Sequence, residues 1–198
     1  MAAPPSDVKP LNMLNMSSLG EPDPANITKQ DILSALAFDK HGEYLAVGDR
    51  GGRVIVFQMI EEDGETDFDY LTEFQSHETA FDPLNSTSIP EKINAIEFVN
   101  LFKSSAKQML TANDKLIKLW RIEYKKEKKY ESCKKLLQKG KLMIPRSKVI
   151  NESWEGRMRK QYRNAHEYHI NSLSLASDGE HFISADDLRI NIWNLENN

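Results

Sequence analysis

The chain has 198 residues, of which 39% are hydrophobic, and a formal net charge of -4, a composition typical of a folded globular protein rather than a disordered or fibrous one. No apolar run approaches the roughly 20 residues of a membrane span, the first residues lack a signal-peptide pattern, and a single cysteine, Cys133, excludes an internal disulfide or a cysteine-based zinc site. We therefore expect one cytoplasmic domain, with the nucleus also accessible, that does not bind a membrane.

The charge is unevenly distributed along the chain. Residues 121–163 carry 15 Lys and Arg against 5 Glu, a balance of +10, which leaves 11 basic and 25 acidic residues on the rest of the chain. We therefore expect an acidic body with one strongly basic insertion, and these two parts favour partners of opposite charge.

The first part of the chain predicts a tail followed by antiparallel strands. Residues 1–28 are rich in Pro, Ser and Asn without periodicity, which predicts a disordered tail ahead of the folded part at 29–198. Apolar runs that alternate with turn residues then predict strands near 32–38, 43–48, 53–59 and 70–76. The acidic stretch 61–69 and the Pro- and Asn-containing stretch 78–90 are predicted to be loops.

The same pattern of apolar runs and tight turns occurs three times. The copies begin at Leu33, Ile93 and Ile170, which open the first strand, and the third strand ends at Phe57, Trp120 and Trp193. Three copies of one supersecondary unit predict a repeat architecture.

An insertion at 121–164 separates the second and third copies. Loops of this length are usually functional or disordered, but its scattered apolar residues favour a protruding hairpin or mobile arm, with 158–165 rejoining the body as the outer strand of the second unit. Its lysines leave three interpretations open: a solvated loop, a nucleic-acid patch or a docking hairpin for an acidic partner. Nucleic-acid binding is the weakest of these, because only Tyr124, Tyr130 and Trp154 offer stacking and no recognised motif surrounds them.

Repeats of about forty residues with an Asp six residues before a Trp resemble the WD-repeat β-propeller family. The buried hydrogen-bond set of that family is matched by His166, Ser184, Asp187 and Trp193 in the third repeat and by Thr111, Asp114 and Trp120 in the second. The histidine expected in the second repeat, His77, is displaced by the 78–90 insertion. The resemblance implies an all-β fold, a partial propeller of about three blades whose third blade lacks its outer strand, with an inserted hairpin arm. Because the family closes seven blades into a ring, we expect a truncated sequence with exposed apolar blade faces.

The segments GDRGGRVIVF, NDKLIKLW, NAHEYHINSLS and SADDLRINIW resemble the 55-kilodalton class of protein phosphatase 2A regulatory B subunits, over residues 31–195. The resemblance implies a regulatory protein that binds the helical-repeat scaffold subunit through the arm, assembles with the catalytic subunit and presents phosphoprotein substrates. It implies no enzyme activity, cofactor or metal here, since the phosphatase chemistry of that complex belongs to another polypeptide. The sequence itself offers no phosphate loop, zincin helix or nucleophile elbow. The alternative is a generic WD-repeat interaction scaffold, or a non-functional fragment, without phosphatase contact.

In a WD-type blade the segments leading into the first strand and the turns between the second and third strands open on one face. This predicts a common substrate-binding face formed by Arg50, Lys92, Tyr168, His169, Asp187 and Leu188, positions to which the resemblance also assigns substrate contact. A structural role remains open for Asp114 and Asp187 as turn acids, for Arg50 as a solvated hairpin tip, and for Tyr168 and His169. An exposed Leu188 favours contact with a partner.

Overall fold

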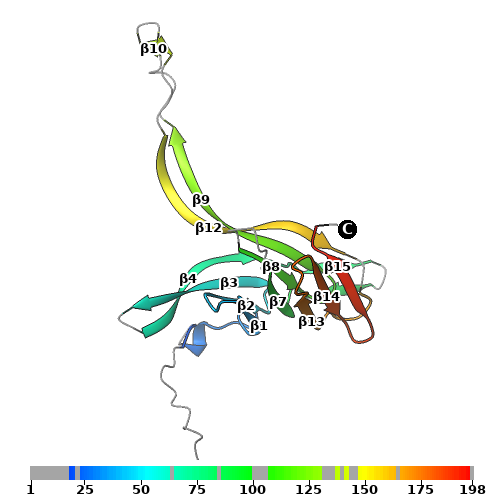
Figure 1. Cartoon of the computed structure of the whole chain (residues 1–198). Helices are drawn as coiled ribbons and strands as arrows, with labels where there is room; N and C mark the ends of the chain where they lie inside the picture. Colours follow the sequence, from blue (N-terminus) through cyan, green and yellow to red (C-terminus); the bar gives the residue numbers. More distant parts are fainter. Residues whose placement is uncertain are drawn as a thin grey trace, which may run out of the picture.

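The structure is a computed structural model that describes residues 18–20, 23–62, 65–83, 86–99, 107–130, 137–138, 141–142, 147–163 and 166–196. The predicted tail at 1–28 lies largely outside the described residues; within it, Pro24–Asn26 forms the short 3-10 helix η1, capped by the side chain of Asp23. The folded part consists of small antiparallel sheets packed side by side (Figure 1). None of the described residues forms a helix long and apolar enough to cross a membrane.

Blade one is a four-stranded sheet in the order β1-β2-β3-β4. Its strands are β1 (Leu33–Phe38), β2 (Tyr44–Asp49), β3 (Arg53–Glu62) and β4 (Glu65–Gln75). The predicted acidic loop at 61–69 is wrong, because β3 and β4 stay paired as far as Glu62 and Glu65. In this hairpin Phe68 alternates with acidic residues and its ring packs 5.8 Å from that of Phe38, so a period-two pattern holds the strand despite its charge.

A two-stranded ribbon, β5 (Ala80–Asp82) and β6 (Thr87–Ile89), occupies the stretch predicted to be a loop at 78–90. Blade two follows, with β7 (Ala95–Val99), β8 (Lys107–Ala112), β9 (Ile117–Tyr130) and β12 (Ser147–Tyr162). Its outer strand is the end of β12, which pairs with β9 from Met158 opposite Trp120 to Tyr162 opposite Ile117. The predicted return of the chain to the second unit is thus confirmed for the described residues.

Beyond blade two, β9 and β12 continue as one twisted ribbon, and we call residues 123–155 the arm. Figure 1 shows this ribbon rising from the blades, with the short strands β10 (Leu137–Gln138) and β11 (Lys141–Leu142) at its far end. Blade three is a three-stranded sheet of β13 (Ser172–Leu175), β14 (His181–Ala185) and β15 (Ile190–Asn194). Among the described residues, the all-β architecture, the inserted hairpin arm and a third blade with three strands and no outer strand agree with the prediction.

The core lies between neighbouring blades rather than within one sheet. One buried cluster joins blades one and two, and its members include Val54, Val56, Ile96, Met109 and Trp120. A second joins blades two and three, and its members include Leu110, Ile117, Tyr162, Phe182 and Leu195. Each blade is therefore stabilised chiefly by its neighbours, as in other repeat proteins.

Two residues predicted to begin the first strand of a blade, Ile93 and Ile170, lie before that strand instead. Ile93 and Ile170 lie just before β7 and β13 and are almost fully buried, whereas Leu33 opens β1 and is 61% exposed. Ile93 packs so closely on Gly48 of blade one that a Cβ at that glycine would lie 2.6 Å from its Cγ2. These isoleucines therefore join one blade to the preceding one.

The two outermost described faces of the stack carry exposed apolar side chains. On blade one they are Leu33, Leu36 and Phe38, and on blade three they are Ile183, Ile190 and Ile192. On β14 and β15 they alternate with the buried Phe182 and Ser184 and the partly buried Trp193, as a strand with one packed face requires. This agrees with the expectation of exposed apolar blade faces.

Candidate functional site

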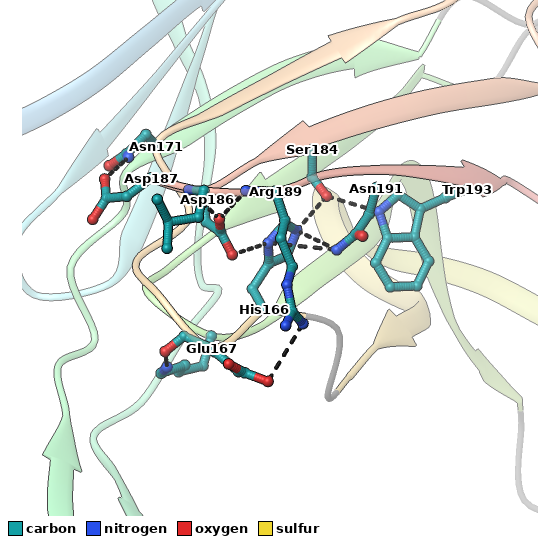
Figure 2. A network of polar contacts seen from close by, with 11 residues as sticks. His166, Glu167, Asn171, Ser184, Asp186, Asp187, Arg189, Asn191 and Trp193 are labelled. Carbon is teal, nitrogen blue, oxygen red and sulfur yellow. Dashed lines mark hydrogen bonds and ion pairs between the residues drawn. The ribbon is translucent and has the colours of Figure 1, made fainter.

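A hydrogen-bond network crosses blade three, and Figure 2 shows it centred on His166. Nδ1 of His166 lies 2.9 Å from Oδ2 of Asp186 and Nε2 lies 2.6 Å from Oγ of Ser184. The indole N–H of Trp193 donates to the same Oγ at 2.8 Å. His166, Ser184 and Trp193 are thus brought together as the sequence predicted.

The carboxylate of this network is Asp186, and the prediction of Asp187 is wrong by one position. Side chains two residues apart lie on the same side of an extended chain. Asp186 therefore points to the same side as Ser184, and both contact His166. Burial alone would raise the pKa of Asp186, but hydrogen bonds from His166 and from the amides of Leu188 and Arg189 outweigh it and lower this pKa to about 2. Asp187 instead accepts a hydrogen bond from the side-chain amide of Asn171 at 2.7 Å.

Blade two contains a modified version of this network. Trp120 Nε1 donates to Thr111 Oγ1 at 3.1 Å, as predicted, and Ser76 Oγ lies 2.8 Å from the same oxygen and 3.1 Å from Nδ1 of His77. Ser76 therefore bridges the gap that the displaced histidine leaves. Burial, with a smaller effect of the Lys118 charge, lowers the pKa of His77 to about 3, so this histidine is neutral at physiological pH.

Asp114 lies outside that buried set, contrary to the prediction. The turn role belongs to Asn113, whose side-chain oxygen accepts the amides of Lys115 and Leu116 at 3.0 and 2.8 Å. Asp114 Oδ1 accepts a hydrogen bond from the side-chain amide of Asn94, in the same blade, at 2.7 Å, and Oδ2 lies 2.9 Å from Nδ1 of His169 in the segment that leads into the next blade.

The turns between second and third strands contact the segments that lead into the next blade. Ile93 donates its N–H to the carbonyl of Asp49 at 3.0 Å, and Ile170 donates to that of Asp114 at 3.1 Å. We call this continuous edge the rim; it consists of the turns 49–52, 113–116 and 186–189 and the segments 90–94 and 167–171. All six residues of the predicted substrate-binding face belong to it.

The rim residues differ in their surroundings. Lys92 and His169 line one depression of about 430 Å³ together with Pro90, Asn94, Asp114 and Asn171. Tyr168 and Leu188 are 45% and 72% exposed and stand outside this depression, and Arg50 is an exposed residue of the blade-one turn. The rim therefore has one recessed part and several projecting side chains.

Two asparagines of the rim, Asn94 and Asn171, were not among the predicted site residues. Asn94 Nδ2 donates to Asp114 at 2.7 Å, and Asn171 Nδ2 donates to Asp187 at the same distance, so each tethers a turn acid in its own blade. The signal was present in the repeated Ile-Asn pairs that precede β7 and β13, each matched by an acid at the tip of the same blade.

The base of the arm is fixed against blade one. Thr72 Oγ1 donates to the carbonyl of Trp154 at 2.7 Å, and Gly156 lies directly on the ring of Phe74. Above this contact the ring of Trp154 lies 5.2 Å from that of Tyr124. Ion pairs then cross the two strands, Lys125 with Glu155 at 3.0 Å and Lys126 with Glu152 at 3.1 Å.

Past these ion pairs the described part of the arm is exposed and basic. Lys128, Lys129 and Lys148 project from it, with exposed apolar or aromatic residues Tyr130, Val149 and Ile150 between them. Cys133 and most of the tip lie outside the described residues. Among the described residues there is also no group of three or more His, Cys, Asp or Glu side chains arranged to hold a metal ion.

The side-by-side antiparallel sheets and the His-Ser-Trp network define a WD-repeat protein, and residues 158–194 match the repeat described as "WD domain, G-beta repeat". The chain belongs to the family of protein phosphatase 2A regulatory B subunits of the 55 kDa class, with about 40% identity over most of its length. The three relatives below support this assignment.

The regulatory B protein of phosphatase PP2A from Schizosaccharomyces pombe is 43% identical over 185 residues, which cover 87% of this chain and 40% of the relative. The phosphatase 2A regulatory protein sur-6 of Caenorhabditis elegans is 41% identical over 185 residues, covering 85% of this chain and 37% of the relative. The gamma isoform of the 55 kDa phosphatase 2A regulatory B protein from Mus musculus is 40% identical over 187 residues, covering 87% and 41%. The chain thus spans about two fifths of the length of these curated relatives, all of which are named as regulatory subunits. Their names agree with the prediction that this chain is a regulator rather than an enzyme.

Proposed function

We propose that the chain acts as a regulatory, substrate-targeting part of a protein phosphatase 2A heterotrimer. In this proposal the arm binds the helical-repeat scaffold subunit, the catalytic subunit is held by the same assembly, and the rim binds phosphoprotein substrates. Its expected compartment is the cytoplasm and the nucleus.

The main support for the proposal is that one strand, β9, leads from the rim into the arm. β9 begins at Ile117, directly after the rim turn 113–116, and runs for 14 residues into the arm. An extended strand of that length spans about 45 Å. A partner on the arm therefore leaves the rim free for a second partner, which is what a protein that joins a substrate to an enzyme requires.

The chemistry of the two surfaces supports different partners. The arm combines exposed lysines with Tyr130, Val149 and Ile150, so it suits an acidic surface with apolar grooves. The rim combines a polar depression with projecting side chains, including Tyr168 and Leu188, which are suited to anchoring a peptide.

The test is co-purification with the scaffold subunit, using a variant designed from the strand pairing. Residues 125–153 are replaced by an Asn-Gly turn, which leaves the Tyr124–Trp154 pair, the blade-two part of β9 and the outer strand 157–162 intact. We expect the intact chain to bind the scaffold subunit and the shortened chain to lose that binding while its melting temperature stays close to that of the intact chain. Equal binding by the two chains would exclude the arm as the scaffold contact. No binding by either would favour a generic WD-repeat interaction scaffold without phosphatase contact.

A further inference from the structure

The carboxylates around the rim depression already have donors within the protein. Asp114 is contacted by Asn94 and His169, Asp187 by Asn171, and Glu91 by the hydroxyl of Thr79 at 2.7 Å. On the neighbouring turn Asp49 is held by Arg53 at 2.8 Å. These acids are therefore occupied in keeping the turns in place.

Two cationic side chains of the same edge lack such partners. The side chains of Lys92 and Arg50 make no hydrogen bond or ion pair with any residue that the structure describes. Lys92 is partly buried in the wall of the depression, whereas Arg50 is exposed outside it. A partly buried ammonium that faces a recess and pairs with none of the carboxylates around it favours an anionic ligand.

The opposite part of the lining is an imidazole in a fixed orientation. Asp114 lies 2.9 Å from Nδ1 of His169, and Asn94 holds Asp114 from the other side while also donating to the carbonyl of Ile170 at 3.0 Å. A neutral imidazole that donates its Nδ1–H to a carboxylate presents Nε2 as an acceptor. Nε2 of His169 has no partner among the described residues.

One recess thus offers an ammonium donor and, in the tautomer that donates Nδ1–H to Asp114, an imidazole nitrogen that can accept. A residue of a polypeptide with an acidic side chain complements both, because its carboxylate or phosphoryl group accepts from an ammonium and its backbone N–H donates to an imidazole. We propose that this depression binds an acidic residue of a protein partner, with the acid on Lys92 and the backbone N–H on Nε2 of His169. Asn94 and Asp114 are the positioning residues of this site.

This site adds one chemical property of the partner to the proposed function, namely an acidic residue that binds at the rim. It rests on the proposed function only in that the partner is a substrate. The rim would select an acidic residue at one position even though the body as a whole is acidic. A partner with only basic residues would leave Lys92 partly buried and unpaired.

The experiment is a titration of the isotopically labelled full chain, followed by NMR at the Lys92 ε-methylene and the His169 ring. The probes are N-acetyl-phosphoserine N-methylamide, N-acetyl-glutamate N-methylamide, the neutral N-acetyl-glutamine N-methylamide and inorganic phosphate. We expect the two acidic amides to shift both signals, the glutamine amide to shift neither, and inorganic phosphate to shift that of Lys92 alone. Tighter binding of the phosphoserine or of the glutamate probe assigns the site to a phosphoryl or to a carboxylate group.

Variants make the test specific to the depression. Lys92→Ala removes one charge-assisted hydrogen bond and should weaken the acidic probes about tenfold, whereas Lys128→Ala, a matched lysine on the arm, should leave them unchanged. Asn94→Ala should abolish the His169 response while the Lys92 response persists. The proposal is overturned if Lys92→Ala binds the acidic probes as well as the original chain does, or if the glutamine amide binds equally. If the probes fail while the scaffold subunit still co-purifies, the acidic-residue site is lost and the proposed function stands.

Discussion

Replacing Thr111 by valine tests whether the polar network inside blade two stabilises the fold. The hydroxyl of Thr111 is fully buried, receives the indole N–H of Trp120 at 3.1 Å and lies 2.8 Å from Oγ of Ser76. Valine has nearly the same shape, so the change removes two hydrogen bonds without opening a cavity.

The expected loss follows from what each partner does afterwards. The Trp120 N–H is left without an acceptor in a residue only 7% exposed, which costs about 1–3 kcal/mol. Ser76 keeps its contact with His77 and loses one hydrogen bond, about 1 kcal/mol. We expect unfolding to become easier by about 3 kcal/mol, which for a chain of this size corresponds to about 6–12 °C in melting temperature.

The measurement is urea unfolding followed by tryptophan fluorescence, with a midpoint that falls at unchanged slope. Thr66→Val, at an exposed position of β4, is the matched control and should change stability by less than about 0.5 kcal/mol. A double-mutant cycle with Trp120→Phe should reduce the cost of Thr111→Val to about 1 kcal/mol, because the orphaned indole donor is then absent. A loss below about 1 kcal/mol, or the same loss in both backgrounds, would show that the network does not act as described.

Three further predictions concern the blades and the arm. Burial lowers the pKa of His77 to about 3 from an ordinary value near 6.5, so the unfolded chain binds more protons than the folded chain between these pH values. Stability should therefore fall as the pH drops through that window, by at most about 1.4 kcal/mol per pH unit. His77→Asn should flatten this slope in melting curves recorded at several pH values. Gly48→Ala places a methyl group 2.6 Å from Ile93 and should lower stability by about 1–3 kcal/mol, whereas Gly51→Ala, with a nearest contact of 3.1 Å, should have a much smaller effect in the same urea assay. Gly156→Ala should loosen the base of the arm and raise amide exchange in its first residues while blade three keeps its protection.

Each of these has an outcome that contradicts it. Stability of the original chain that does not change between pH 6.5 and 4 would contradict a lowered pKa of His77. Equal losses of stability for Gly48→Ala and Gly51→Ala would show that the close contact of Gly48 with Ile93 does not govern packing. Unchanged exchange in the arm after Gly156→Ala would mean that another contact holds its base.

The blades were predictable because their strands follow a two-residue period and tight turns separate them. Charge misled the prediction at 61–69, where acidic residues occupy the solvent side of a β-hairpin whose other side carries Phe68. In the same way the ribbon at 80–89 contains Pro83 and was predicted to be a loop, although its strands lie on either side of that proline. Polar composition alone does not exclude a strand when alternate positions remain apolar.

The candidate site was predictable to the level of the rim but not to its contacts. The spacing of the repeats places Lys92, His169 and Asp187 on one edge, since that follows from blade topology alone. Which of two adjacent acids turns inward depends on the side of the chain on which Ser184 lies, and this distinguishes Asp186 from Asp187. The contact of Asp114 with His169 joins two blades, and no pattern within one repeat could reveal it.

The continuous pairing of β9 with β12 has a consequence for how this chain tolerates changes in length. Each added residue in an extended ribbon turns the following side chains to the opposite side. A single insertion between Ile122 and Tyr124 would therefore invert the arm, placing Lys125 on the face that now carries Tyr124, whereas a pair of insertions would preserve its orientation. Natural or designed length variants at the root of the arm should accordingly add or remove residues in pairs.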